Sequence, residues 1–363
     1  MGQAVRLFPR QPLPRERDCR HERHSGADDG GGQPHGRNDP PVPPADAADG
    51  GFPTGKAAGI LLRLGGLHRF QQGVPGKNAR FPRFSSAERA GGGGRRMIHA
   101  VGTALGEIIQ NLRRTVRLTL YENRSRRAGM LLGRWWDLLS PLLQILIYWF
   151  VFSVGLGTQE KNGFPYHLWL MCGMMPWLAL NSAILGASAS IQQAASIIRN
   201  VRIPLSIIPM KAVVRAYYEH LWTMAILLIA LLLGGVPVTW HYLELAYYLA
   251  ASWVLLIGAA LLTSSLTAVF RDFGELLQPL MRLLFYVSSV VWAIDGLSPG
   301  LQRVMRLNPL VYIIEGYRKC LLYGEGFWSS PGQGAYFWLA ALALLAAGCT
   351  LHMRLRNRFI DQL

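Results

Sequence analysis

Six long apolar stretches follow one another along the last two thirds of the chain, separated by short polar or basic segments. Each stretch is close to the ~20 residues that an α-helix needs to cross ~30 Å of hydrocarbon. The predicted spans are Leu138–Gly157, Tyr166–Ser190, Tyr217–Gly235, Leu245–Phe270, Leu276–Leu297 and Ala335–Met353. The pattern therefore predicts an all-α integral membrane protein with six transmembrane helices.

A seventh, amphipathic helix is predicted before the first span, over Glu107–Tyr121. Its apolar positions recur at helical spacing: Ile108, Ile109, Leu112, Val116 and Leu120. Arginines occupy the other faces: Arg113, Arg114 and Arg117. This arrangement is typical of a helix that lies along a membrane surface, either as an anchor or as a contact for a partner.

An outer helix is predicted between the fifth and sixth spans, over Pro309–Leu322. Asn308 is a suitable N-cap and Pro309 suits the first helical position. The segment is too polar to span, so we expect a re-entrant helix that dips back from the outer face. Glu315 and Arg318 are three residues apart and are expected to form an ion pair.

The segment between the second and third spans is predicted to form a short helix over Ile191–Val201, which Pro204 and Pro209 then end. Arg199 and Arg202 place positive charge at its tip. Such a rigid element could transmit a push from a motor protein to the bundle, and a simple basic connector is the alternative.

Positive charge predicts the orientation. With the N-terminus in the cytoplasm, the cytoplasmic segments hold sixteen Lys and Arg residues and the external ones five, so both termini are predicted to be cytoplasmic. The formal net charge of +16 then reflects membrane topology and a basic tail. Nucleic acid is not an expected partner, because the basic residues flank spans and form no patch with interleaved aromatics.

The first 96 residues differ in composition from the rest. They hold 18 of the 39 Gly and 11 of the 21 Pro without apolar periodicity, so a disordered tail is predicted. Translation starting at Met97 is a further hypothesis, which N-terminal sequencing would test. Within the tail, Gly50–Ala57 nearly matches a phosphate-binding loop, but Ala57 replaces the Ser or Thr that holds magnesium.

No catalytic, cofactor-binding or metal-binding constellation is predicted. The four cysteines show no CxxC spacing, and the histidines are scattered near span ends. Glu219 beside His220 is the one candidate for an enzymatic site, and Arg215 one turn away offers Glu219 an ordinary partner. A transport subunit without its own ATPase site is therefore favoured over a membrane enzyme or a stand-alone secondary transporter.

Several motifs together resemble the permeases of ABC exporters for cell-envelope polymers, most closely the wall teichoic acid translocation permeases. The resemblance covers about residues 97–363 and rests on "CGMMPWLALNSAI", "RNVRIPLSIIP", "FRDFGELLQPLMRLLFYVSSVVWAI", "LNPLVYIIEGYRKCLL" and "RNRFIDQL". It implies a multi-pass protein of the bacterial cytoplasmic membrane that pairs with a second copy of itself and with two copies of a separate ATPase subunit. The implied cargo is a lipid-linked anionic glycan; O-antigen, capsule or drug export is the alternative.

The same resemblance implies roles for individual residues. The helix over Ile191–Ile203 would couple to the ATPase through Ser196, Arg199, Asn200, Arg202 and Ile203. A polymer needs a wider path than the centre of one six-helix bundle, which also favours a two-fold dimer. Aromatic side chains could pack on sugar rings and Arg282 could attract phosphates, so the candidate path residues are Tyr148, Trp177, Arg282, Phe285 and Tyr286.

Overall fold

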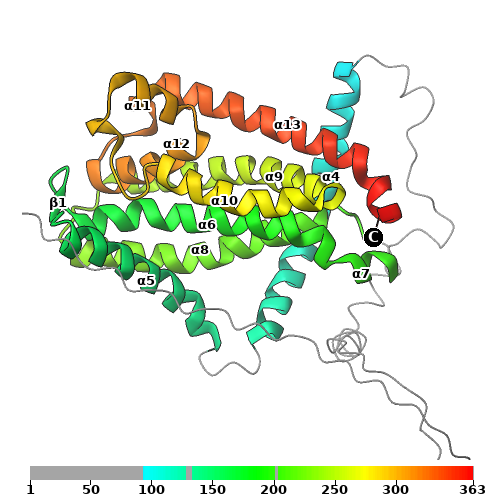
Figure 1. Ribbon diagram of the computed structural model, residues 1–363, viewed down its shortest axis with the longest axis horizontal. Coiled ribbons are helices and arrows are strands. Elements are labelled where there is room, and N and C mark those ends of the chain that lie inside the picture. Colours follow the sequence, from blue (N-terminus) through cyan, green and yellow to red (C-terminus); the bar gives the residue numbers. More distant parts are fainter. Residues whose placement is uncertain (1–92, 128–132, 201–202, 363) are drawn as a thin grey trace, which may run out of the picture. The chain divides into compact units, whose positions relative to one another are not determined.

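The computed structural model describes residues 93–127, 133–200 and 203–362, and this part of the chain is mostly helical (Figure 1). The helices are α4 (Gly93–Arg127), α5 (Trp136–Trp149), α6 (Tyr166–Gln193), α7 (Ala195–Asn200), α8 (Ile207–Leu233), α9 (Leu245–Val269), α10 (Arg271–Val287), α11 (Pro299–Arg306), α12 (Pro309–Arg318) and α13 (Pro331–Gln362). Short 3-10 or π segments are η1 (Gly133–Trp135), η2 (Phe150–Gly155), η3 (Trp240–Glu244), η4 (Ile294–Gly296), η5 (Lys319–Tyr323) and η6 (Phe327–Ser329). The strands β1 (Glu160–Lys161) and β2 (Phe164–Pro165) pair as an antiparallel hairpin.

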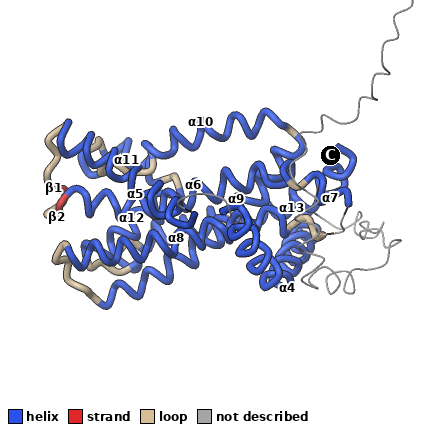
Figure 2. Tube along the Cα trace, turned by 90° about the horizontal axis from the view of Figure 1, so that it is seen from below, coloured by secondary structure: helices blue, strands red, loops and turns tan. Residues whose placement is uncertain are grey.

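The long helices α6, α8, α9, α10 and α13 run side by side, and α4 crosses their direction (Figure 1). We call the end of this bundle that carries α7 and the C-terminal turns of α13 the α7 end. The opposite end, with β1 and β2, is the hairpin end (Figure 2). Connections at the two ends alternate, so successive long helices run in opposite directions.

Four described helical segments are long and apolar enough to cross a membrane: Tyr166–Gln193, Ile207–Leu233, Trp240–Val269 and Pro331–Arg356. They correspond to the second, third, fourth and sixth predicted spans. The first predicted span forms α5 and η2, whose apolar part, Leu139–Gly155, is shorter. An all-α membrane architecture is therefore confirmed, whereas the count of six stays a prediction.

The predicted fifth span, Leu276–Leu297, is wrong in its boundaries. The helix α10 begins five residues earlier and ends at Val287. Ser289 then takes a left-handed conformation with φ of 60°, which a helix cannot continue through. After this turn, Ile294 packs in a small cluster with Val311 of α12, and Trp292 packs against that cluster.

The end of the predicted short helix also differs from expectation. Pro209 does not break a helix but lies in the first turn of α8, where the missing N–H group has no helical partner to lose. The third membrane helix therefore starts at Ile207, ten residues before the predicted start. As a result, Glu219 lies near the middle of α8 and not near its beginning.

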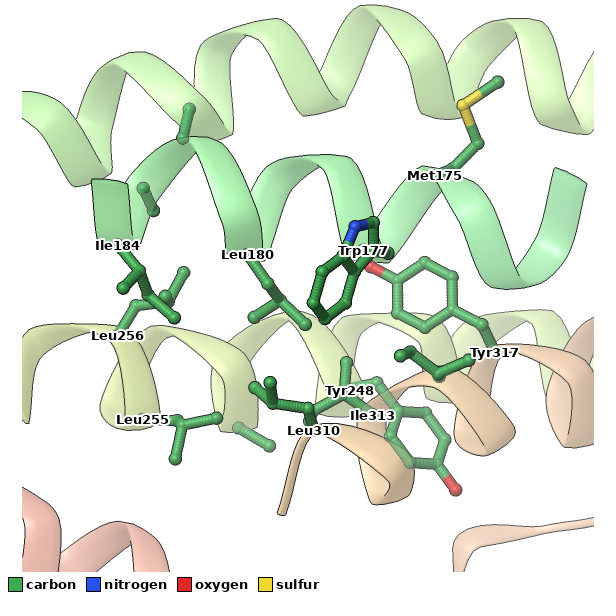
Figure 3. Packing of buried hydrophobic residues seen from close by; sticks show 14 of the residues in the cluster. Met175, Trp177, Leu180, Ile184, Tyr248, Leu255, Leu256, Leu310, Ile313 and Tyr317 are labelled. Atoms are coloured by element: carbon green, nitrogen blue, oxygen red, sulfur yellow. The ribbon is translucent and has the colours of Figure 1, made fainter. Parts of the chain in front are cut away.

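The core of the bundle forms where α12 packs against α6 and α9. Figure 3 shows Trp177 and Leu180 of α6, Leu255 of α9 and Ile313 and Tyr317 of α12 in this layer. These five side chains are at most 3% exposed. The helix α12 is thus buried among membrane helices, although it is too short to cross a bilayer itself.

Two glycines bring α9 and α13 into close contact. A Cβ on Gly348 would lie 2.3 Å from the carbonyl oxygen of Gly258, and one on Gly258 would lie 2.6 Å from the backbone nitrogen of Leu345. Small residues at such positions let membrane helices approach through their backbones. Only glycine fits here without moving one helix.

The amphipathic helix exists but is longer than predicted. Expected over Glu107–Tyr121, it runs through all 35 residues of α4, including Gly93–Arg96 at the end of the predicted disordered tail. Extending a formed helix adds one hydrogen bond per residue, which favours this continuation. The rest of the tail lies outside the described residues.

The apolar residues of α4 occupy two adjacent faces. One face, with Ala104 and Ile108, is buried against α8 and α13. The neighbouring face leaves Ile109 70% and Leu112 38% exposed. An exposed apolar face beside an arginine-bearing face is the arrangement of a helix at a membrane surface.

Candidate coupling site and translocation surface

The predicted coupling segment forms a separate short helix at the α7 end. A turn at Ala194 ends α6, and α7 follows. Ser196 on α7 is exposed and Ile203, just after it, is half-buried. Arg199 and Asn200 are the last two residues of α7, and Arg202 lies outside the described residues.

A small apolar cluster connects α7 to the helices around it. Its buried members come from four parts of the chain and are Ile191, Leu205, Ile208, Ala268 and Phe359. Ile198 of α7 packs against this cluster. Gln192 also donates a hydrogen bond of 2.9 Å to the backbone oxygen of Thr267 in α9. A displacement of α7 would therefore strain α6, α8, α9 and α13 together, because close-packed side chains transmit strain.

Glu107 joins three helices at the same end. Its carboxylate accepts a hydrogen bond of 2.7 Å from Ser206 at the start of α8, and one of 3.1 Å from Arg356 of α13. Lys211 of α8 pairs with Glu122 further along α4. These contacts fasten α4 across α8 and α13. These contacts could not be predicted from local spacing, since Glu107 is 249 positions from Arg356.

Four of the five predicted path residues form one aromatic group where α5, α6 and α10 meet. The ring centroid of Phe285 lies 5.1 Å from that of Tyr148, 5.5 Å from that of Trp177 and 5.1 Å from that of Tyr286. Trp177 and Phe285 are buried, at 3% and 5% exposure, and pack inside the subunit. They hold α10 against α5 and α6.

Two of the five predicted path residues, Tyr286 and Arg282, face outward. Tyr286 is 51% exposed, and Arg282, one turn earlier on the same side of α10, is also exposed. Along α10 only Leu277, Met281 and Phe285 are buried. Figure 2 shows α10 along one edge of the bundle. One face of α10 thus presents an arginine and a tyrosine next to the aromatic group.

The predicted pair of Glu315 and Arg318 is present. The Nη1 atom of Arg318 lies 2.8 Å from Oε1 of Glu315, and the arginine is fully buried. In the turn after α10, the same Nη1 donates to the backbone oxygen of Ser289 (2.6 Å) and Nη2 donates to that of Val290 (2.8 Å). The buried charge is therefore compensated by a carboxylate and by carbonyl dipoles.

Trp169 and Gly173 complete the surroundings of this arginine. The guanidinium carbon lies 3.4 Å from the ring centroid of Trp169, which is a cation–π contact. A Cβ on Gly173 would lie 2.3 Å from Nη2 of Arg318, so glycine leaves the space that the side chain fills. The network joins α12, α6 and the turn after α10, and it was not foreseen beyond the single ion pair.

The alternative enzymatic site is an ordinary ion pair. Arg215 and Glu219 lie 2.9 Å apart, as their spacing predicts. Among the described residues, no group of three or more His, Cys, Asp and Glu side chains could hold a metal ion. The loop-like segment Gly50–Ala57 lies outside the described residues.

The fold and its apolar helices define a multi-pass membrane protein. The family description "ABC-2 type transporter" matches residues 114–322, more than half of the chain and the region from α4 through α12. The chain therefore belongs to the ABC-2 type transporter family. Permeases of this family work with an ATPase subunit.

Similar proteins come from several bacteria. The O-antigen export system permease protein RfbA of Klebsiella pneumoniae is 24% identical over 247 residues, which cover 68% of this chain and 93% of that protein. The polysialic acid transport protein KpsM of Escherichia coli is 25% identical over 243 residues, covering 65% and 90%. The inner membrane transport permease YadH of Escherichia coli K12 is 26% identical over 194 residues, covering 50% and 73%.

Proposed function

We propose that this chain is the membrane-spanning subunit of an ATP-driven exporter that moves a lipid-linked cell-envelope polysaccharide outward across the bacterial cytoplasmic membrane. The observation that carries the proposal is the family match over residues 114–322, together with relatives named for O-antigen export and polysialic acid transport. These names favour a polymer of the O-antigen or capsule class. Wall teichoic acid, the cargo suggested by the sequence motifs, stays a narrower prediction.

The proposed topology has six passes with the α7 end in the cytoplasm. Lys and Arg gather at this end, which supports a cytoplasmic position. In this topology α5 with η2 and α10 provide the two passes beyond the four long helices. The helix α12 is then re-entrant from the outer face, and its burial among α6, α9 and α13 supports that role.

Coupling to the ATPase is proposed to run through α7 and the residues after it: Ser196, Arg199, Asn200, Arg202 and Ile203. The apolar cluster that connects α7 to four helices supports this proposal; its buried members are Ile191, Leu205, Ile208, Ala268 and Phe359. The helix α4 would lie beside it on the inner membrane surface, fastened by Glu107. Movement of an ATPase docked there would reach the bundle through packed side chains.

Two copies of the chain and two ATPase subunits are proposed to form the exporter. A polar side chain on a membrane helix is costly against lipid, so the exposed face of α10 with Arg282 needs protein or water beside it. A second copy meeting α10 would supply both. Tyr148 and Tyr286 would then border the path, while Trp177 and Phe285 support it from within the subunit.

The experiment that tests the proposal follows the polymer after depletion of this chain. Lipid-linked polysaccharide is expected to accumulate inside the cell and to disappear from the surface, and chemical analysis of that polymer distinguishes O-antigen or capsule from teichoic acid. Reconstituted with its ATPase, the wild type should transport only when ATP is present. Transport at the same rate without the ATPase would refute the proposal.

A charge reversal tests the coupling site. Arg199→Glu is expected to lower ATP-driven export and co-purification of the ATPase, because it removes a positive charge from the proposed docking helix. Lys161→Glu reverses a charge on the hairpin at the other end of the bundle and serves as the control. Equal losses in both variants would argue against α7 as the docking element.

A further inference from the structure

A polar cleft lies between three membrane helices, apart from the surfaces discussed above. It measures about 270 Å³ and is lined from the first half of α5 and the middle of α6 and α8. Its polar lining residues are Ser140, Gln144, Asn181, Ser182, Arg215, Glu219, His220 and Thr223. Two of these helices, α6 and α8, are long and apolar enough to cross the membrane, so the cleft lies at membrane depth.

The polar side chains that line this cleft need hydrogen-bond partners. In hydrocarbon, an amide or hydroxyl without a hydrogen bond is strongly disfavoured, and polar residues inside membrane spans commonly mark binding sites. His220 is 3% exposed and its Nε2 atom lies 2.9 Å from the hydroxyl of Tyr317, but its Nδ1 atom has no hydrogen-bond partner among the described residues. Packing within this subunit therefore leaves hydrogen-bonding capacity unused at the cleft.

The charge of the cleft favours an uncharged ligand. Among the described residues that line it, only Arg215 and Glu219 carry a formal charge, and they neutralise each other at 2.9 Å. An anionic phosphate would have to compete with the Glu219 carboxylate for the guanidinium. A neutral group with several hydroxyls can instead use the amides of Gln144 and Asn181, each of which offers both a donor and an acceptor.

The shape of the cleft agrees with a sugar-sized headgroup. Its volume is just below the ~300 Å³ at which pockets for drug-sized ligands begin, so one small ring fits better than a polymer segment. Trp136 at its edge is 45% exposed and offers an aromatic face to the apolar side of such a ring. Ser140 and Ser182 are also exposed, so the cleft opens onto the surface of the helices, where lipid can enter sideways.

We propose that this cleft binds the uncharged, hydroxyl-rich headgroup of a glycolipid from the surrounding membrane. Gln144 and Asn181 hold the hydroxyls, His220 offers the remaining ring nitrogen, and Trp136 covers one face of the sugar. The site is separate from the aromatic group at α10 and needs neither ATP nor an ATPase. The inference therefore goes beyond the proposed export function. The lipid site could prove absent while the export function still holds.

Photolabelling of the full chain in nanodiscs tests the proposal. One probe is a glucosyl diacylglycerol with a diazirine near the headgroup, and the other is phosphatidylglycerol with the same diazirine. The glucosyl probe is expected to label peptides of α5, α6 and α8 at the cleft, and unlabelled glucosyl diacylglycerol should compete. Competition by soluble methyl glucoside alone, without any by the lipid, would overturn the assignment to a lipid headgroup.

Variants on two different helices separate binding from folding. Gln144→Leu on α5 and Asn181→Leu on α6 should each lower labelling about five- to tenfold, the effect of losing one or two hydrogen bonds. Gln193→Leu changes an exposed amide of α6 outside the cleft and should leave labelling unchanged. Thermal unfolding and gel filtration identify any variant that fails to fold. If one cleft variant fails to fold, labelling of the other cleft variant tests the proposal. Equal labelling by both probes, or unchanged labelling in a folded cleft variant, would overturn the proposal.

Discussion

Arg318 illustrates how a full positive charge is accommodated within packed helices. The side chain is fully buried, yet it contacts Glu315, three backbone oxygens and the face of Trp169. Ser289 also donates a hydrogen bond of 2.6 Å to the same Glu315 oxygen. Arginine suits this place better than lysine, because its planar fork reaches several acceptors at fixed angles.

Arg318→Met should therefore destabilise the protein by about 3–5 kcal/mol, since it removes the positive charge that pairs with Glu315 and the donors to three backbone oxygens. The measurement is thermal or denaturant unfolding of the purified chain. Lys319→Met is the matched control, because the neighbouring lysine is partly exposed and, among the described residues, its ammonium group contacts Ser329, Ser330 and, at 3.8 Å, Glu325. Similar unfolding of the two variants would contradict the importance given to the Arg318 network.

Two of the contacts that hold the helices together cannot be recognised in the sequence. The close approach of α9 and α13 at Gly258 and Gly348 has no counterpart in hydropathy, because a glycine in an apolar stretch does not reveal what it touches. The fastening of α4 by Glu107 likewise joins residues far apart in the chain. Both features determine how the membrane helices fit together.

Gly348→Val should separate α9 from α13 and lower stability by about 1–3 kcal/mol, the usual effect of overpacking. Gly332→Val, on the same helix, meets open space at its Cβ position and is the control. Unfolding temperature and the yield of monodisperse protein in detergent give the comparison. If both variants behaved alike, the two helices could not be in backbone contact.

Glu107→Gln should loosen α4 from α8 and α13 while leaving the long helices intact. The carboxylate is about one-fifth exposed and makes two contacts, so we expect a loss near 1 kcal/mol. Amide hydrogen exchange should accelerate along α4 and at the start of α8. Glu160→Gln, on the hairpin, should change neither the exchange of α4 nor that of α8. If α4 stayed as protected in Glu107→Gln as in the wild type, Glu107 could not be what fastens it.

The helices that hydropathy predicts well are those whose residues are apolar on every side. The second, third, fourth and sixth spans were found for this reason. The cap at Asn308 and the pair at Glu315 were also predictable, because both depend on residues within one helical turn. Local chemistry and average hydropathy therefore account for most of the elements.

The fifth span shows where this reasoning stops. The stretch after Val287 is as apolar as a membrane helix, but Ser289 turns the chain back and its neighbours pack on α12. Of the candidate site, the sequence predicted a short helix near α7 and named the four aromatic residues as path candidates, but it predicted neither the cleft nor the contacts of Glu107. Those need side chains from three helices, and their proximity follows only from the folded arrangement.

Charge and polarity are distributed unevenly over the assembled bundle. Basic residues concentrate at the α7 end, and α10, at one edge of the bundle, carries the exposed side chains of Arg282 and Tyr286. In the proposed exporter, the α7 end would contact the ATPase and the α10 edge would contact a second copy of the chain. The transport path would then be complete only in that assembly.

Cysteine cross-linking tests the second surface. Leu283→Cys on α10 should form a disulfide-linked dimer in membranes under mild oxidation, because the exposed face of α10 is expected to meet its copy. Leu339→Cys on α13 is even more exposed, at 71% against 59%, and should stay monomeric. The native cysteines of the described residues, Cys172, Cys320 and Cys349, are buried and should not react. Dimers from Leu339→Cys alone would assign the interface to another helix.

The early end of α10 has a consequence for the lipid around it. Seventeen residues extend about 26 Å, less than the ~30 Å of an average hydrocarbon layer. If α10 completes a pass, thinning of the adjacent leaflets is one way to relieve the hydrophobic mismatch. A hydrophilic cargo beside Arg282 would then meet a shorter barrier than elsewhere in the bilayer, and export would be fastest in membranes with short acyl chains.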